Sequence, residues 1–137
     1  MTNLNPYINF KDTAKQAMEF YQTVLGGELV MDTFKEGGMS NDPAIDNLIM
    51  HAQLNTSKGF ILMASDAPPG MDASLRGGMS ISLSGDESEE LKVYWNKLSE
   101  GANITVPMAK SPWGDEFGML TDKFGVDWLV NISPKKA

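Results

Sequence analysis

Residues 121–132, TDKFGVDWLVNI, and residues 55–66, NTSKGFILMASD, carry one pattern twice. In each stretch a turn ends in a glycine, Gly125 or Gly59, directly before an apolar run, and these two glycines are 66 residues apart. A glycine-containing turn that leads into an apolar run is typical of a β-hairpin. The sequence therefore predicts the same hairpin in two places, as expected for a duplicated supersecondary unit.

An amphipathic helix is predicted before each hairpin. Asp12 is the expected N-cap of the first helix, because its carboxylate can accept hydrogen bonds from backbone N–H groups of the first turn. Asp86, followed three residues later by Glu89, predicts a capping box at the second helix. The apolar positions recur at helical spacing and form one stripe on each helix: Ala14, Ala17, Met18, Tyr21, Val24 and Leu25 in the first, Leu91, Tyr94, Trp95 and Leu98 in the second.

The remaining apolar segments predict strands. They lie at residues 5–10, 28–35, 48–55 and 59–65, and again at 79–84, 103–109, 118–122 and 126–132. The order is strand, helix and three strands, written twice, so the expected fold class is α+β with tandem βαβββ modules. We expect one domain over residues 1–137, with modules at 1–66 and 78–133 and a Pro- and Gly-rich connection at 67–77.

The composition narrows the classes of function. The net charge is −7, with scattered Lys and Arg, so the surface would repel a phosphate backbone and we expect no nucleic-acid partner. No apolar run is long enough to cross a bilayer, and residues 1–10 lack the pattern of a signal peptide, so no membrane partner is expected. The absence of cysteine excludes thiolate chemistry and agrees with a cytoplasmic location.

Two motifs resemble a known superfamily. The segment PYINFKDTAKQAMEFYQTVLGGEL resembles the first module of vicinal oxygen chelate (VOC) proteins, the glyoxalase/bleomycin resistance fold. The segment PWGDEFGMLTDKFGVDW is similar to the PhnB-like branch of that superfamily. The resemblance implies a cup-shaped mixed sheet with the helices on its outer face, a small-molecule cavity inside the cup, and a homodimer. Fold alone does not choose the activity, because the superfamily includes metal-dependent lyases and dioxygenases as well as metal-free binding proteins.

The metal-dependent members of this superfamily hold a divalent ion with four His or carboxylate ligands on the strands. By strand position, the matching residues here are Asn5, Gln53, Ser80 and Leu129. None is a histidine or a carboxylate, the usual donors for such ions. We therefore predict no metal ligands and no cofactor, with a divalent metal as the disfavoured alternative.

A polar sheet face is the predicted ligand site. Strand alternation places polar residues on one face and apolar residues on the helix side. The only histidine, His51, is the candidate acid/base group, but a polar residue at the rim without special chemistry is the favoured interpretation, because no carboxylate is spaced to orient the imidazole. Trp113 is read either as a lid over the ligand or as loop packing. The predicted ligand-binding residues are Asn5, Tyr7, Asn9, His51, Gln53, Ser80, Ser82 and Trp113. Asp66 and Asp115 are expected in loops without paired partners.

The sequence indicates a homodimeric protein that binds a small polar molecule and has no catalytic metal. Two alternatives remain open: a metal-dependent lyase or dioxygenase of the same superfamily, and a non-catalytic interaction module. Relatives in the PhnB-like branch are sometimes labelled ubiquinone methyltransferases. The chain has no glycine-rich loop suited to S-adenosylmethionine, so we do not predict methyl transfer.

Overall fold

The computed structural model describes residues 5–38, 40, 42–67 and 79–135, and it divides into two compact units, Met1–Leu75 and Arg76–Ala137. The first unit contains β1 (Tyr7–Phe10), α1 (Ala14–Leu25), β2 (Glu28–Thr33), a short 3-10 helix η1 (Pro43–Ile45), β3 (Ile49–Asn55) and β4 (Ile61–Asp66). The second contains β5 (Ile81–Gly85), α2 (Ser88–Leu98), β6 (Asn103–Lys110), β7 (Glu116–Thr121) and β8 (Asp127–Ile132). The predicted connection lies outside the described residues, apart from Ala67.

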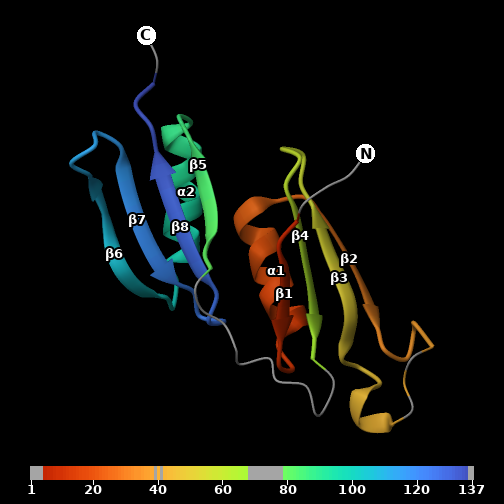
Figure 1. Cartoon of the computed structure of the whole chain (residues 1–137). Helices are drawn as coiled ribbons and strands as arrows, with labels where there is room; N and C mark the ends of the chain where they lie inside the picture. The colour runs from red at the N-terminus through yellow and green to blue at the C-terminus, as the bar shows by residue number, and fades with distance from the viewer. Residues whose placement is uncertain (1–4, 39, 41, 68–78, 136–137) are drawn as a thin grey trace. The chain divides into compact units, whose positions relative to one another are not determined.

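Each unit is one four-stranded mixed sheet with a helix on one face (Figure 1). The strand order is β1-β4-β3-β2 in the first sheet and β5-β8-β7-β6 in the second. In both sheets the first strand pairs in parallel with the last, and the other pairs are antiparallel. The predicted α+β class and the tandem βαβββ order are confirmed.

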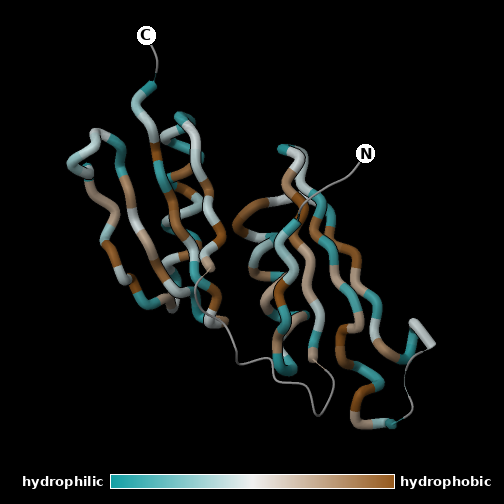
Figure 2. Tube along the Cα trace, in the orientation of Figure 1, coloured by the Kyte–Doolittle hydropathy of each residue, from teal (hydrophilic) through white to brown (hydrophobic). Residues whose placement is uncertain are grey.

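A small hydrophobic core fills the space between each helix and its sheet. The buried side chains of α1 are those of the predicted stripe, except that Leu25 is half-buried, and α2 buries all four predicted residues. Figure 2 shows hydrophobic and hydrophilic positions alternating along the strands, so each sheet turns its apolar side to its own helix. Trp95 and Trp128, predicted as packing residues, are both buried. Neither helix in the described parts of the chain has the length and hydrophobicity needed to cross a membrane.

The two hairpin turns share the same backbone hydrogen bonds. Thr56 N donates to Phe60 O at 3.0 Å, and Asp122 N donates to Val126 O at 2.8 Å. Gly59 and Gly125 have φ angles of +87° and +83°, a region that glycine adopts without a Cβ penalty. Each also donates its N–H to the first residue of its turn. The repeat visible in the sequence is therefore a repeat of backbone geometry.

The parallel strand pairs repeat in the same way. Ala67 N donates to Phe10 O at 2.7 Å after β4, and Ser133 N donates to Gly85 O at 2.8 Å after β8. Ile8 is the partner of Ala64 in the first sheet, and Leu83 is the partner of Val130 in the second. The equivalent positions of the two units can therefore be named residue by residue.

The predicted helix caps are wrong. Asp12 has a φ of +65° and precedes the N-cap residue, Thr13, whose side chain makes no cap hydrogen bond. The first turn is capped instead by Asp66, at the end of β4, whose Oδ1 accepts from Ala14 N at 2.9 Å. Asp66 is buried rather than in an exposed loop. The N-cap of α2 is Glu87 rather than Asp86, and the Glu87 side chain makes no cap hydrogen bond.

Candidate functional site

The first sheet presents a polar face on the side opposite α1. Residues that pair directly across a sheet share a face, and the ladder places Tyr7, Met63, Gln53 and Val30 in one row across all four strands. The same face also carries Glu28, Asp32, Asn9, Ser65, His51, Asn55 and Ile61. Four of the predicted ligand-binding residues, Tyr7, Asn9, His51 and Gln53, therefore lie on one face.

His51 lies on β3, an inner strand of the sheet. The rings of Tyr7 and His51 are tilted against one another, with centroids 5.9 Å apart. Asp32 on β2 is the direct ladder partner of His51. Among the described residues, no hydrogen bond to the His51 imidazole is formed, so both ring nitrogens can serve a ligand.

Asp32 was missed by sequence reasoning, which found no carboxylate spaced to orient His51. The carboxylate comes from a neighbouring strand across a long loop, in a regular ladder that a β-bulge interrupts just after this pair. Asp32 pairs with His51 but the next residue, Thr33, pairs with Ile49, which leaves Met50 as the extra residue. Bulges often re-aim side chains beside functional sites. The only sequence signal was the alternation of β2, and that does not reveal its register against β3.

Other polar groups on this face hold one another in place. Ser65 Oγ donates to Asn9 Oδ1 at 3.3 Å, and Gln53 Nε2 donates to Asn55 Oδ1 at 2.8 Å. The amide oxygen of Gln53 has further hydrogen-bonding capacity. The face thus offers donors and acceptors with apolar contacts from Val30 and Met63.

The corresponding face of the second sheet is more apolar than predicted. Ser82, a predicted ligand-binding residue, lies on it together with Ser84, but their ladder partners are Leu129 and Asn131. Leu129 and Asn131 pair in turn with Met119 and Phe117. Phe117 is thus the counterpart of His51, and Met119 the counterpart of Gln53.

Two further predicted ligand residues lie at the margin of this second face. Trp113 is 62% exposed, and its ring meets that of Phe117 edge to face at a centroid distance of 5.5 Å. Ser80 is exposed just before β5, as Asn5 lies just before β1. Asp115, expected to be unpaired, accepts from Asn131 Nδ2 at 2.9 Å.

The structure revises the metal positions inferred from the sequence. Leu129 lies on β8 and faces Ser82, and its counterpart is Met63, which lies on β4 and faces Tyr7. Gln53, on β3, is therefore not the equivalent of Leu129. The thioether of Met63 and the alkyl side chain of Leu129 are not suitable ligands for Zn, Ni, Fe or Mn ions. The residues at these two positions therefore do not fit a metal centre. In residues 5–38, 40, 42–67 and 79–135, no three His, Cys, Asp or Glu side chains form a metal-binding group.

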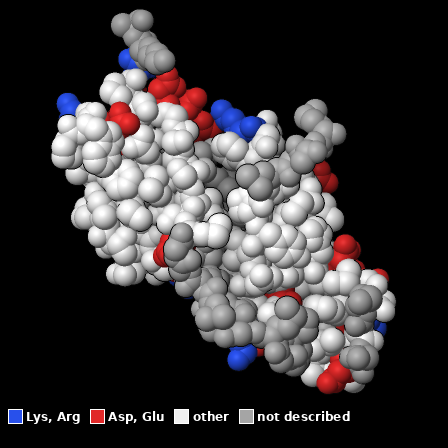
Figure 3. Space-filling model, viewed as in Figure 1, with Lys and Arg blue, Asp and Glu red and all other residues white. Residues whose placement is uncertain are grey.

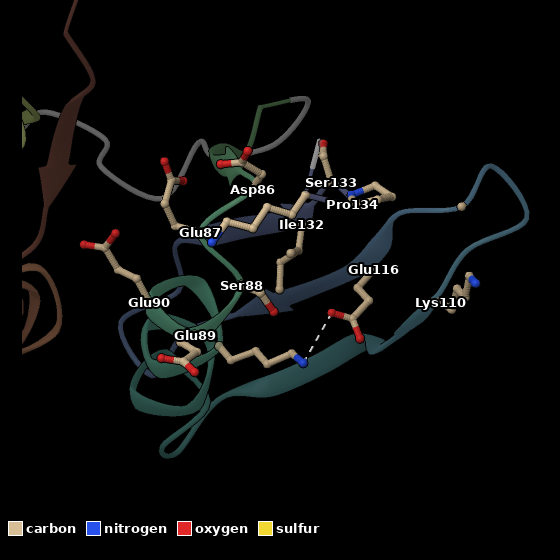
Figure 4. Close-up of a pocket in the computed structure, with 13 residues that line it drawn as sticks. Asp86, Glu87, Ser88, Glu89, Glu90, Lys110, Glu116, Ile132, Ser133 and Pro134 are labelled. Atoms are coloured by element: carbon tan, nitrogen blue, oxygen red, sulfur yellow. Dashed lines mark ion pairs between the residues drawn. The ribbon is translucent and has the colours of Figure 1, made fainter. Parts of the chain in front are cut away.

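A separate open pocket of about 1000 Å³ lies beside α2 in the second unit (Figure 4). Acidic residues at the start of α2 line one side, and Glu116 lies across from them, where it pairs with Lys92 at 3.5 Å. None of the eight predicted ligand-binding residues lines this pocket. Negative charge at a helix N-terminus interacts favourably with the helix dipole, which accounts for Glu89 and Glu90 without a ligand.

In the view of Figure 3, Lys, Arg, Asp and Glu side chains form small scattered groups on a largely uncharged surface. Near the pocket, burial and the hydrogen bond from Tyr94 Oη to Glu90 at 2.6 Å raise the pKa of Tyr94 to about 12. This phenol is held in its neutral form and acts as a hydrogen-bond donor in the fold.

Solved structures share this fold. The structure of a glyoxylase/bleomycin resistance protein/dioxygenase domain from Frankia sp. EAN1pec matches 97% of this chain and 98% of its own, with a TM-score of 0.65 and 17% identity. The structures of protein PA1353 from Pseudomonas aeruginosa and of the PhnB protein from Bacillus cereus match more closely. Their TM-scores are 0.85 and 0.80, at 37% and 25% identity, over 98% and 96% of this chain and all of theirs. These likenesses define the glyoxalase/bleomycin resistance fold and its PhnB-like branch.

The model of the family described as 3-demethylubiquinone-9 3-methyltransferase matches residues 2–131, and the chain belongs to this family. Protein YjdN of Escherichia coli (strain K12) is 31% identical over 140 residues, which cover 94% of each chain. The uncharacterized protein Mb0911c of Mycobacterium bovis is 24% identical over 93% of this chain and 80% of its own. The predicted membership of the PhnB-like branch of the VOC superfamily is confirmed.

Proposed function

We propose that this protein binds a small polar molecule on the exposed face of its first sheet, without a catalytic metal. One observation carries the proposal: the rings of Tyr7 and His51 lie 5.9 Å apart on a face that also carries Asn9, Ser65 and Gln53. Few but specific polar groups within an apolar frame are typical of ligand sites. His51 is the candidate acid/base group on this face.

The polar face differs from an ordinary solvated sheet face in two respects. Tyr7 and Val30 are large side chains that remain 48% and 51% exposed. The bulge at Met50 lies directly beside His51 in a sheet that is otherwise regular. A face that serves only for solubility needs neither feature. Both support a ligand that covers the apolar groups and bonds to the polar ones.

The proposal departs from the activity named in the family description. A methyltransferase of that kind needs a site for S-adenosylmethionine, and no segment of this sequence resembles a glycine-rich nucleotide loop. We therefore propose binding rather than methyl transfer. Calorimetry with S-adenosylmethionine tests this point, because saturable binding at micromolar concentration would overturn it.

The test of binding is a thermal-shift screen against a library of small polar compounds, followed by His51→Ala and Gln53→Ala. We expect at least one stabilising compound whose affinity falls about tenfold in each variant, because one hydrogen bond to the ligand is lost. Lys15→Ala, on the exposed side of α1, is the matched control and should change nothing. Compounds that bind equally to all variants, or no hit at all, would contradict the proposal.

Metal content separates this function from the alternative of a metal-dependent lyase or dioxygenase. We expect the purified protein to bind its ligand equally well before and after dialysis against a chelator. Stoichiometric Zn, Ni, Fe or Mn, with binding lost on chelation, would instead favour the metal-dependent alternative. If no compound binds and the protein instead binds a macromolecular partner, the alternative of a non-catalytic interaction module is favoured.

We also propose that the protein acts in the cytoplasm as a homodimer. The lack of cysteine suits a reducing compartment, and the proposed dimer follows from the resemblance to other VOC proteins. Light scattering should then give twice the 15.0 kDa mass of one chain. A monomer at high concentration would contradict the assembly without affecting the proposed site.

A further inference from the structure

We propose that the polar face of the first sheet recognises an organic cation, a ligand with an ammonium group on an apolar or aromatic body. This inference rests on the proposed function, and it names the charge class of the ligand. It follows from the charges on the face, the order of its side chains, and the contrast with the equivalent face of the second sheet.

The charges on this face have one sign. The ladder places two carboxylates there, Glu28 and Asp32, both exposed on β2. No Lys or Arg occupies a face position of β1 to β4 in the part of the chain that the structure describes. The lysines of the first unit lie in loops, on α1 or at the hairpin turn, at residues 11, 15, 35 and 58. An anionic ligand would meet no cation here and would be repelled by two carboxylates.

The side chains follow an order that suits a cation with an apolar body. Asp32 is the ladder partner of His51, and the His51 ring approaches the Tyr7 ring. Asp32 and Tyr7 lie on opposite edge strands, β2 and β1, so the carboxylate would attract the ammonium group by charge, while the rings of His51 and Tyr7 would contact the apolar or aromatic body. Val30 and Met63, which share the next row of the face, offer contacts to the rest of the ligand.

The second sheet provides an internal comparison. Its equivalent face has Phe117 in place of His51 and Met119 in place of Gln53. Its carboxylate, Asp127, is occupied, because Oδ1 accepts from Thr121 Oγ1 at 2.6 Å. The second face is therefore the more apolar and aromatic one and its Asp127 is already hydrogen-bonded, whereas the first face carries two carboxylates. We assign the cation to the face of the first unit.

Three probes of similar size test the charge class. Benzyltrimethylammonium, benzyl alcohol and phenylacetate are titrated into the full chain, and backbone NMR signals are followed. We expect benzyltrimethylammonium to bind at least fivefold more tightly than benzyl alcohol, and phenylacetate to bind most weakly. The shifted signals should include those of Asp32, His51 and Tyr7.

A pair of variants separates local recognition from the overall charge. Asp32→Asn should weaken the binding of benzyltrimethylammonium about fivefold and leave the affinity for benzyl alcohol unchanged. Glu19→Gln removes the same charge from the exposed side of α1 and should leave both affinities unchanged. Equal binding of the three probes, or equal effects of the two variants, would overturn this inference while the proposed function stands. If neither these probes nor any compound of the screen shifts the signals of the face, both fail.

Discussion

Gly118 on β7 lies against the indole of Trp95 on α2: a Cβ at Gly118 would be 2.7 Å from Cη2 and 3.0 Å from Cζ3 of that ring. The large ring therefore packs where the strand has no side chain. The hairpins of the two units are 66 residues apart, so Gly118 corresponds to Ala52 in the first unit. On the helix of that unit, Tyr21 takes the place of Trp95. Tyr21 and Ala52 are both fully buried. The equivalent space in the two cores is thus filled by different pairs of residues, Trp95 with Gly118 and Tyr21 with Ala52.

We expect Gly118→Ala to lower the free energy of unfolding by about 1 to 3 kcal/mol, because a buried ring and a strand backbone must both shift. Urea denaturation followed by Trp fluorescence measures this. Gly85→Ala is the matched control, since the added methyl would meet chiefly the flexible end of the Glu87 side chain. The prediction fails if the two substitutions cost the same.

The double variant Trp95→Tyr with Gly118→Ala copies the pair of the first unit into the second. We expect it to be more stable than the sum of the two single changes predicts, by about 1 kcal/mol or more, because the smaller ring leaves room for the methyl. A double-mutant cycle by urea denaturation gives the coupling. Simple additivity would show that the ring and the glycine do not share one space.

The buried carboxylate of Asp66 joins two segments of the first unit. Its Oδ1 accepts from Ala14 N and its Oδ2 from Ile49 N, each at 2.9 Å. Asp66→Ala should cost about 2 to 4 kcal/mol, because two N–H groups lose a charged acceptor in a buried site. Asp66→Asn keeps one acceptor oxygen and should cost about half as much. Thermal and urea unfolding would measure both.

The contrast with Asp12 makes this prediction specific. Asp12, the cap expected from sequence, makes no cap hydrogen bond, and its φ of +65° is one that Asn tolerates. Asp12→Asn should therefore change stability by less than about 0.5 kcal/mol. A large loss in Asp12→Asn with a small one in Asp66→Ala would reverse the assignment of the cap.

The raised pKa of Tyr94, about 12, predicts a loss of stability at high pH. The neutral phenol is favoured in the folded state, so its contribution is complete below the ordinary pKa of about 10 and is lost as the pH rises through about 12. Across this range the loss should reach no more than about 3 kcal/mol. Tyr94→Phe should flatten this part of the curve of stability against pH. An unchanged slope in the variant would contradict the role of Tyr94.

The repeated hairpin, the two amphipathic helices and their buried stripes could all be predicted from the sequence. Each depends on periodicity and turn chemistry within about a dozen neighbouring residues. Gly59 and Gly125 are examples, because a positive φ at a turn is a local requirement that glycine meets. The polar alternation of β1 and β3 was predictable for the same reason, and it led to Tyr7, Asn9, His51 and Gln53.

The remaining features depend on which strands pair and in what register, and that is set by contacts between residues far apart in the chain. The capping of α1 by Asp66 spans 52 residues. The pairing of Asp32 with His51 depends on the register of β2 against β3, and the equivalence of Met63 with Leu129 depends on the parallel pairs β1–β4 and β5–β8. A shift of one residue in register would turn each of these side chains to the other face of its sheet. Local pattern thus determined the elements, whereas packing between distant segments decided which side chains meet.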